Sequence, residues 1–272
     1  MMFRSFSFRG LPLLFGACAL TFVLTGACGD DDAGAEPSTS GATGTASGAN
    51  TPPSSGATVD TAASPTLLAP ASQYSILVQD LGIANFITDP KGTFLLDSAN
   101  YGATGAFDGA EAGKTMLEKW GYIEGFESAM TPEGGASSVL NGGYAINQEI
   151  HLFRTADGAE TAYKYFVDRI SSNGITSTVT VQTVGNEAAA FRLVTGKVGG
   201  SSNVAQVLHQ IVFRRGNMVA IMLTIGAEPL MTTDTVRELS LMVDGKALGA
   251  RDHPVPTPVP ARPTQAPATA RP

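Results

Sequence analysis

Apolar residues recur at helical spacing in three segments of the chain. In residues 156–171 the apolar positions fall on one side of a helix: Ala159, Ala162, Tyr163, Phe166, Val167 and Ile170. Residues 109–120 carry a similar apolar face. A third face begins after Thr232, Thr233 and Asp234, which are good helix-capping residues, and ends near Gly245. The pattern therefore predicts three amphipathic helices.

Other segments alternate between apolar and polar positions, as strands do. Residues 144–153 alternate throughout, which predicts a half-buried strand. Two very apolar runs, residues 204–213 and 218–225, are joined through Arg215, Gly216 and Asn217, and this predicts a tight hairpin in the centre of the sheet. Residues 176–184 and 188–195 flank Gly185 and Asn186 and predict a second hairpin. We expect shorter strands at residues 94–96 and 122–130.

The predicted hairpins are grouped in the sequence rather than alternating with helices. This order favours an α+β fold, with an antiparallel sheet and about three helices packed mainly on one face. Two five-residue stretches, 107–111 and 156–160, share an Asp-Gly-Ala-Glu core, lie 49 residues apart and lead into predicted helices. They indicate a possible duplicated strand-helix-strand unit in which Asp108 and Asp157 cap the helices. The composition of a helix start alone also explains the likeness.

The first residues have the features of an export signal. Arg4 and Arg9 precede an apolar run of 14 residues, 11–24. A membrane-spanning helix needs about 20 apolar residues, so this run is too short to span. Residues 1–27 are therefore predicted to be a signal peptide.

The segment Leu24-Thr25-Gly26-Ala27-Cys28 resembles the lipobox of bacterial lipoprotein precursors, although Thr25 stands where that family usually has Leu. The resemblance implies cleavage before Cys28 and attachment of fatty acyl chains, such as palmitate, to that cysteine. The protein would then be anchored by lipid to the extracytoplasmic face of the cell membrane. Cys18 is a competing site inside the apolar run, and an ordinary secretory signal cleaved after Ala27 is the other alternative.

Two segments of biased composition flank the predicted domain. Of residues 29–65, 30 of 37 are Gly, Ala, Ser, Thr or Pro, which predicts a disordered tether over residues 28–65. Its root-mean-square reach as a flexible coil is about 35 Å. Residues 249–272 hold seven of the 16 prolines and predict an extended, Pro-rich disordered tail. Residues 66–248 are the single predicted globular domain.

Charge and cysteine content narrow the possible functions. The net charge is −7, and the longest basic cluster is the pair Arg214 and Arg215, so we expect no nucleic-acid partner. Removal of Cys18 with the signal peptide and lipidation of Cys28 would leave no thiol, disulfide or cysteine metal ligand.

The predicted domain lacks the common catalytic motifs: no Gly-x-Ser-x-Gly, phosphate-binding loop, dinucleotide fingerprint or His-Glu-x-x-His occurs. We therefore expect no enzyme, no cofactor and no bound metal. Glu149 and His151 lie on one strand face and could share a proton, or bind a metal with one further ligand. The alternative is a solvent-facing polar sheet surface. His209 lies on an apolar face and is interpreted as a hydrogen-bonded core histidine.

Trp120 and Tyr122 follow the first predicted helix and are candidates for the wall of a pocket that takes an apolar or sugar ligand. The alternative is that Trp120, the only tryptophan, fills the core.

Residues 158–160, 184–188 and 211–220 resemble bacterial envelope lipoproteins with PsbP-like or sensor-like extracellular domains. Most of those families have no assigned chemistry. The predicted anchor, the long tether and the lack of catalytic motifs favour a non-enzymatic, lipid-anchored cell-envelope protein that binds a small ligand or a partner protein at the cell surface. The resemblance transfers no functional residue. Two other functions remain open: an envelope hydrolase that uses Glu149 and His151, and a structural envelope component that meets another layer through its Pro-rich tail.

Overall fold

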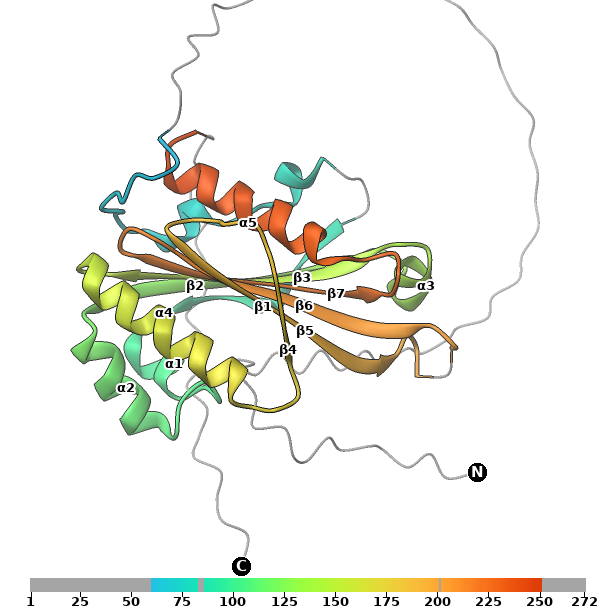
Figure 1. The fold of residues 1–272 in the computed structure, drawn as a ribbon, viewed down its shortest axis with the longest axis horizontal. Helices are drawn as coiled ribbons and strands as arrows, with labels where there is room; N and C mark the ends of the chain where they lie inside the picture. The colour runs from blue at the N-terminus through green and yellow to red at the C-terminus, as the bar shows by residue number, and fades with distance from the viewer. Residues whose placement is uncertain (1–59, 83–85, 201, 251–272) are drawn as a thin grey trace, which may run out of the picture.

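The computed structural model describes residues 60–82, 86–200 and 202–250. The predicted signal peptide, Cys18, Cys28, and most of the predicted tether and tail lie outside these residues. The described residues form one seven-stranded antiparallel sheet with helices packed against it (Figure 1). The predicted α+β class is confirmed.

The strands lie in the order β1-β2-β3-β7-β6-β5-β4 across the sheet. Their bounds are β1 Phe86–Leu96, β2 Tyr122–Pro132, β3 Tyr144–Phe153, β4 Ser177–Val179, β5 Glu187–Lys197, β6 Ala205–Arg215 and β7 Met218–Ala227. The α-helices are α1 Ser98–Gly102, α2 Ala110–Lys119, α3 Gly135–Leu140, α4 Ala156–Ser171 and α5 Thr233–Ala247, with two 3₁₀ helices, η1 Ala71–Tyr74 and η2 Val78–Leu81. The three helices that the sequence predicts are α2, α4 and α5.

The two predicted hairpins differ in how much of them forms. Strands β6 and β7 pair in the middle of the sheet, and their turn is formed by Gly216 and Asn217. Gly216 has φ +56°, in the left-handed region that glycine tolerates. The second hairpin is much shorter than predicted, because only Ser177–Val179 pairs with β5.

Helices cover both faces of the sheet, whereas the prediction had them packed mainly on one face. Figure 1 shows α5 on one side of the sheet and α1, α2 and α4 on the other. Each layer has its own apolar core: Val236, Leu239 and Val243 of α5 pack in one cluster, and Ala162 and Phe166 of α4 pack in the other. Strand β3 is therefore buried on both faces rather than half-buried, and its residues Ile150 and His151 both have no exposed surface.

The two similar five-residue stretches occupy different positions in their helices. Gly109 is the N-cap residue of α2, and Asp108 instead pairs with Arg169 of α4 at 2.7 Å. Thr155 caps α4, because its hydroxyl accepts a hydrogen bond from the Gly158 amide, so Asp157 lies inside the first turn. Neither aspartate is a cap, and the likeness reflects the composition of helix starts rather than a structural repeat.

Residues 60–76, which we call the strap, run along the α5 side of the sheet before β1 begins. Four of its side chains, Leu67, Ala71, Tyr74 and Ile76, belong to the apolar core beneath α5. The strap therefore completes this layer of the fold.

Candidate functional site

The predicted pair Glu149 and His151 is brought together on β3. The Nε2 atom of His151 lies 3.1 Å from Oε2 of Glu149. The pair is not on a solvent-facing surface: Glu149 is 7% exposed and His151 is 0% exposed. The ring of Phe166 from α4 stacks over the imidazole with centroids 6.0 Å apart. The alternative of an open polar sheet surface is wrong, because helices cover this face.

Two tyrosines complete a buried hydrogen-bonded cluster with this pair. The Tyr101 hydroxyl of α1 donates to Oε2 of Glu149 at 3.0 Å, and its ring lies 4.4 Å from the imidazole. The Tyr122 hydroxyl lies 3.3 Å from Nδ1 of His151. We call Tyr101, Tyr122, Glu149 and His151 the buried cluster. Tyr122, Glu149 and His151 are among the predicted site residues, whereas Tyr101 was missed.

Gly125 makes room for the buried cluster. It is directly opposite His151 in the β2–β3 ladder. A Cβ atom at this position would lie 2.8 Å from Nδ1 of His151 and even closer to the Tyr122 hydroxyl. Only glycine, which has no side chain, leaves space for both rings here.

Burial and charge keep the two phenols protonated. Burial, and then the Glu149 carboxylate, raise the pKa of Tyr101 well above its usual value. The same two causes, in the same order, raise the pKa of Tyr122. A second carboxyl group belongs to Glu127 of β2, which lies directly opposite Glu149 in the β2–β3 ladder and is also buried. The buried cluster is a set of hydrogen-bonded polar groups in the core.

Trp120 fills the core, as the alternative interpretation proposed. Its ring packs against Phe107 and Tyr165 with centroids 6.2 and 5.2 Å apart. Tyr122 instead directs its hydroxyl to His151. The binding of an apolar or sugar ligand near these residues stays a prediction.

His209 behaves as a hydrogen-bonded core histidine. Its Nδ1 atom lies 2.8 Å from the Thr233 hydroxyl, which ties β6 to the first turn of α5. Burial, and secondarily the positive charge of Arg192, lower the pKa of His209.

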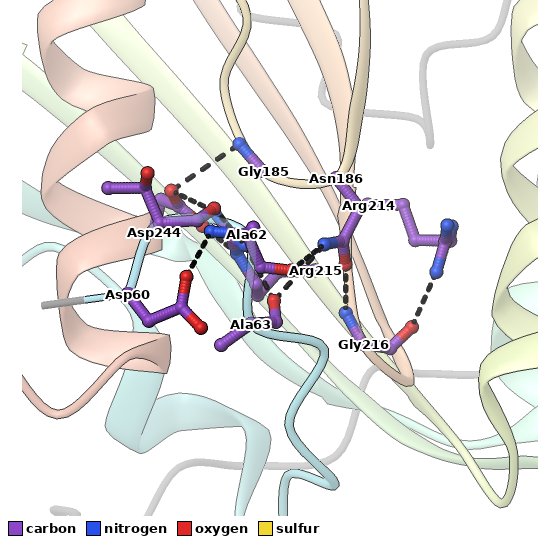
Figure 2. Close-up of polar contacts among 10 residues, drawn as sticks. Asp60, Ala62, Ala63, Gly185, Asn186, Arg214, Arg215, Gly216 and Asp244 are labelled. Atoms are coloured by element: carbon purple, nitrogen blue, oxygen red, sulfur yellow. Dashed lines mark hydrogen bonds and ion pairs between the residues drawn. The ribbon is translucent and has the colours of Figure 1, made fainter.

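A second polar centre holds the strap and was not predicted from the sequence. Arg215, at the end of β6, is 1% exposed and forms a two-pronged ion pair with Asp244 of α5: Nε to Oδ1 at 2.6 Å and Nη2 to Oδ2 at 2.8 Å. Its remaining nitrogen, Nη1, donates to the carbonyl oxygens of Thr61 and Ala63, both at 2.7 Å (Figure 2). Aspartate fixes one edge of the guanidinium, and the strap occupies the other.

Asn186 contacts the same stretch of the strap from the turn before β5. Its Nδ2 atom donates to the Ala63 carbonyl at 3.1 Å and to the Ala62 carbonyl at 3.4 Å, and its Oδ1 atom accepts from the Gly216 amide. We call Asn186, Arg215 and Asp244 the clamp. Sequence reasoning identified Asn186 and Arg215 only as parts of turns, because their partner is the main chain of a distant segment.

Side chains farther along also bind the main chain of the strap. The side-chain oxygen Oδ1 of Asn217 accepts a hydrogen bond from the main-chain N–H of Leu67 at 2.6 Å, and its Nδ2 atom donates to the Leu67 carbonyl at 3.1 Å. Lys246 is buried and donates to the Ser75 carbonyl at 2.7 Å and to the Asp80 carboxylate at 2.6 Å. The domain thus binds main-chain atoms of the strap in addition to burying its apolar side chains.

No protein-family model matches the chain, and no curated protein matches it. Among solved structures, it is similar to the extracellular domain of PknH from Mycobacterium tuberculosis. The two share 15% sequence identity with a TM-score of 0.40, and the match covers 66% of this chain and 95% of that one.

Two further properties concern residues 60–82, 86–200 and 202–250. No helix in this part of the chain combines the length and apolar character that crossing a membrane requires. Within the same residues, no three His, Cys, Asp or Glu side chains are grouped so as to hold a metal ion.

Proposed function

We propose that this chain is a lipid-anchored protein of the cell envelope, carried on the extracytoplasmic face by Cys28, whose domain binds a ligand or a partner rather than catalysing a reaction. The observation that carries the proposal is the clamp. Asn186 from the turn before β5 and Arg215 from β6 both donate to main-chain carbonyls of three successive residues, Thr61 to Ala63, and Asp244 of α5 fixes the Arg215 side chain from behind. The domain thus fixes the segment through which a linker from Cys28 would join it.

The buried cluster supports a non-enzymatic role. A general base must come within hydrogen-bond reach of its substrate. Glu149 and His151 are instead buried and hydrogen-bonded to each other, with Tyr101 on the carboxylate and Tyr122 on the imidazole. A satisfied buried network rigidifies a core and gives it a unique packing.

The end of the domain opposite the clamp offers a surface for binding. Figure 1 shows α3 at the end of the sheet away from the C-terminal end of α5, which carries Asp244. Leu140 of α3 and Leu230, after β7, are 40% and 55% exposed. These exposed leucines are the surface at which we propose that a partner binds.

Lipid anchoring is tested by the mass of the N-terminal peptide. We would express the full chain in a bacterium that processes lipoproteins, isolate its membranes, and compare the wild type with Cys28→Ser and the control Cys18→Ser. We expect a wild-type N-terminus at Cys28 that carries the added mass of acyl chains. Cys18→Ser should retain this mass and Cys28→Ser should lose it. An unmodified N-terminus in the wild type would contradict the proposal.

The binding role has its own test. The full-length protein is purified from membranes in mild detergent, and its mass is measured by mass spectrometry under native and under denaturing conditions. A discrete extra mass in the native spectrum identifies a bound ligand or partner. Hydrolysis of model esters that is lost in Glu149→Gln would instead favour the envelope hydrolase.

A further inference from the structure

The strap is held in two different ways along its length. In residues 67–76 apolar side chains enter the core: Ala71 and Ile76 have no exposed surface, and Leu67 and Tyr74 are also buried. In residues 60–66 no residue is buried, and four of them contact the domain through main-chain atoms: Thr61, Ala62, Ala63 and Pro65. The first part is therefore held without buried apolar side chains, whereas the second part combines hydrogen bonds with burial of apolar side chains in the core.

The polar contacts of the first part all end on the clamp or on the hairpin beside it. Arg215 holds the carbonyls of Thr61 and Ala63, and Asn186 holds those of Ala62 and Ala63. Gly216 lets the chain pass directly over the β6–β7 turn, since any Cβ atom there would collide with the Pro65 carbonyl. Main-chain carbonyls are present in every residue, so this grip does not depend on the side chains of residues 61–63.

The ion pair between Arg215 and Asp244 does not depend on contacts with the strap. The Arg215 side chain is 1% exposed and that of Asp244 is 8% exposed, and the two-pronged pair is complete without residues 60–66. If those residues leave, Nη1 loses its carbonyl partners but gains access to water, while the ion pair stays in place. Opening at this point is therefore local and need not unfold the sheet or α5.

We propose that residues 60–66 form a releasable attachment, in which the clamp bears tension on the N-terminal segment and gives way before residues 67–76 leave the core. Release would lengthen the connection to the domain by about 24 Å, the extended length of seven residues. The proposal rests on the proposed lipid anchor only for the source of the tension. The two-stage attachment itself is a property of the fold and can be tested without lipid.

The test removes the grip without leaving a buried charge. Truncating only Arg215 would strand Asp244 in the core, whereas replacing both members of a buried pair by apolar residues is often tolerated. The double variant Arg215→Met/Asp244→Leu therefore removes the arginine grip on the Thr61 and Ala63 carbonyls and leaves Asn186 in place. We call it the clamp variant. The matched control is Arg214→Met/Glu187→Leu, which removes the neighbouring ion pair, formed at 2.6 Å, that does not touch the strap.

The measurement is the N-terminus of the fragment that survives elastase, determined by mass spectrometry on the full-length protein. Elastase cuts after small residues, which are abundant before residue 66. We expect the resistant fragment to begin at or before residue 61 in the wild type and the control. In the clamp variant it should begin between residues 63 and 67, with a cleavage rate in this stretch about tenfold higher or more.

Three outcomes would overturn the proposal. One is the same N-terminus in all three proteins, which would mean that the clamp does not hold residues 60–66. Another is cleavage of the clamp variant beyond residue 76, which would mean that the strap leaves as one piece. The last is an equal increase in elastase cleavage in the control Arg214→Met/Glu187→Leu. The circular dichroism spectrum of each variant shows whether it is folded; if Arg215→Met/Asp244→Leu is not, Asn186→Ala provides the same test with a smaller expected increase, about threefold.

An unlipidated N-terminus would contradict the proposed function and leave the elastase result valid. An unchanged elastase pattern would contradict this inference and leave the lipid anchor intact.

Discussion

The side-chain amide of Gln148 forms a two-way hydrogen-bonded pair with the main chain of Ile76. Its Oε1 atom accepts from the Ile76 amide at 2.8 Å, and its Nε2 atom donates to the Ile76 carbonyl at 2.6 Å. The strap has no strand beside it at this point, and buried main-chain groups must find partners. Gln148 of β3 supplies the hydrogen-bond partners of Ile76. Asn217, in the β6–β7 turn, does the same for the main chain of Leu67.

Gln148→Glu is expected to destabilise the protein by about 3 kcal/mol at neutral pH, because a buried carboxylate would face the Ile76 carbonyl without a proton to donate. A protonated glutamic acid restores the donor, so the pKa of the introduced carboxyl is higher in the folded than in the unfolded state. The folded state then binds more protons, and stability falls as pH rises through that range.

Urea unfolding at pH 5 and pH 8 measures this effect. The control is Gln73→Glu, where an exposed amide donates to the Leu68 carbonyl at 2.7 Å; its introduced carboxylate remains in water. Equal stability losses in the two variants, or a Gln148→Glu loss that does not change with pH, would show that the Gln148 pair is unimportant.

Tyr101→Phe is expected to lower the free energy of unfolding by about 2 kcal/mol, because it removes a buried hydroxyl that donates to the Glu149 carboxylate. The control Tyr165→Phe removes a hydroxyl that donates to the neutral Ala106 carbonyl at 3.0 Å, and should cost about 1 kcal/mol. Thermal and urea unfolding compare the two. A smaller loss for Tyr101→Phe than for Tyr165→Phe would argue against a charge-assisted bond in the buried cluster.

Strong periodicity made part of the fold predictable. The observed bounds of α4 and β3 match the predicted ones, because their apolar positions repeat over 16 and 10 residues. Helix α1 has only five residues, too few for a periodic signal, so Tyr101 could not be assigned to a site. The burial of both faces of β3 could not be predicted either, since polar residues such as Gln148, Glu149 and His151 normally indicate a solvent-exposed face.

The clamp shows most directly where prediction from sequence ends. Arg215 and Asp244 are 29 residues apart, and Arg215 and Ala63 are 152 apart. Nothing local marks a carbonyl as the partner of a particular arginine. A turn signal identified Gly216 correctly, but the close passage of Pro65 over it depends on the whole fold. Local patterns thus gave the elements, while the contacts that hold the strap depend on how those elements pack.

The pH dependence of stability should report on His209. Its pKa is lowered in the folded state, chiefly by burial and secondarily by Arg192, below the unfolded value of about 6.5. The unfolded state therefore binds more protons near and below that pH. The stabilising contribution is complete above about pH 6.5 and is lost as pH falls toward the folded-state pKa.

His209→Asn is the informative variant, because its side-chain amide carries both a donor and an acceptor to replace Nδ1 opposite the Thr233 hydroxyl but does not titrate. We expect the free energy of unfolding to fall less between pH 7.5 and pH 5.5 in this variant than in the wild type. Thr233→Val removes the hydroxyl and keeps the buried imidazole, so its pH dependence should resemble that of the wild type. If His209→Asn and the wild type lose stability equally over this range, another group carries the pH dependence and the imidazole of His209 is not held neutral by its surroundings.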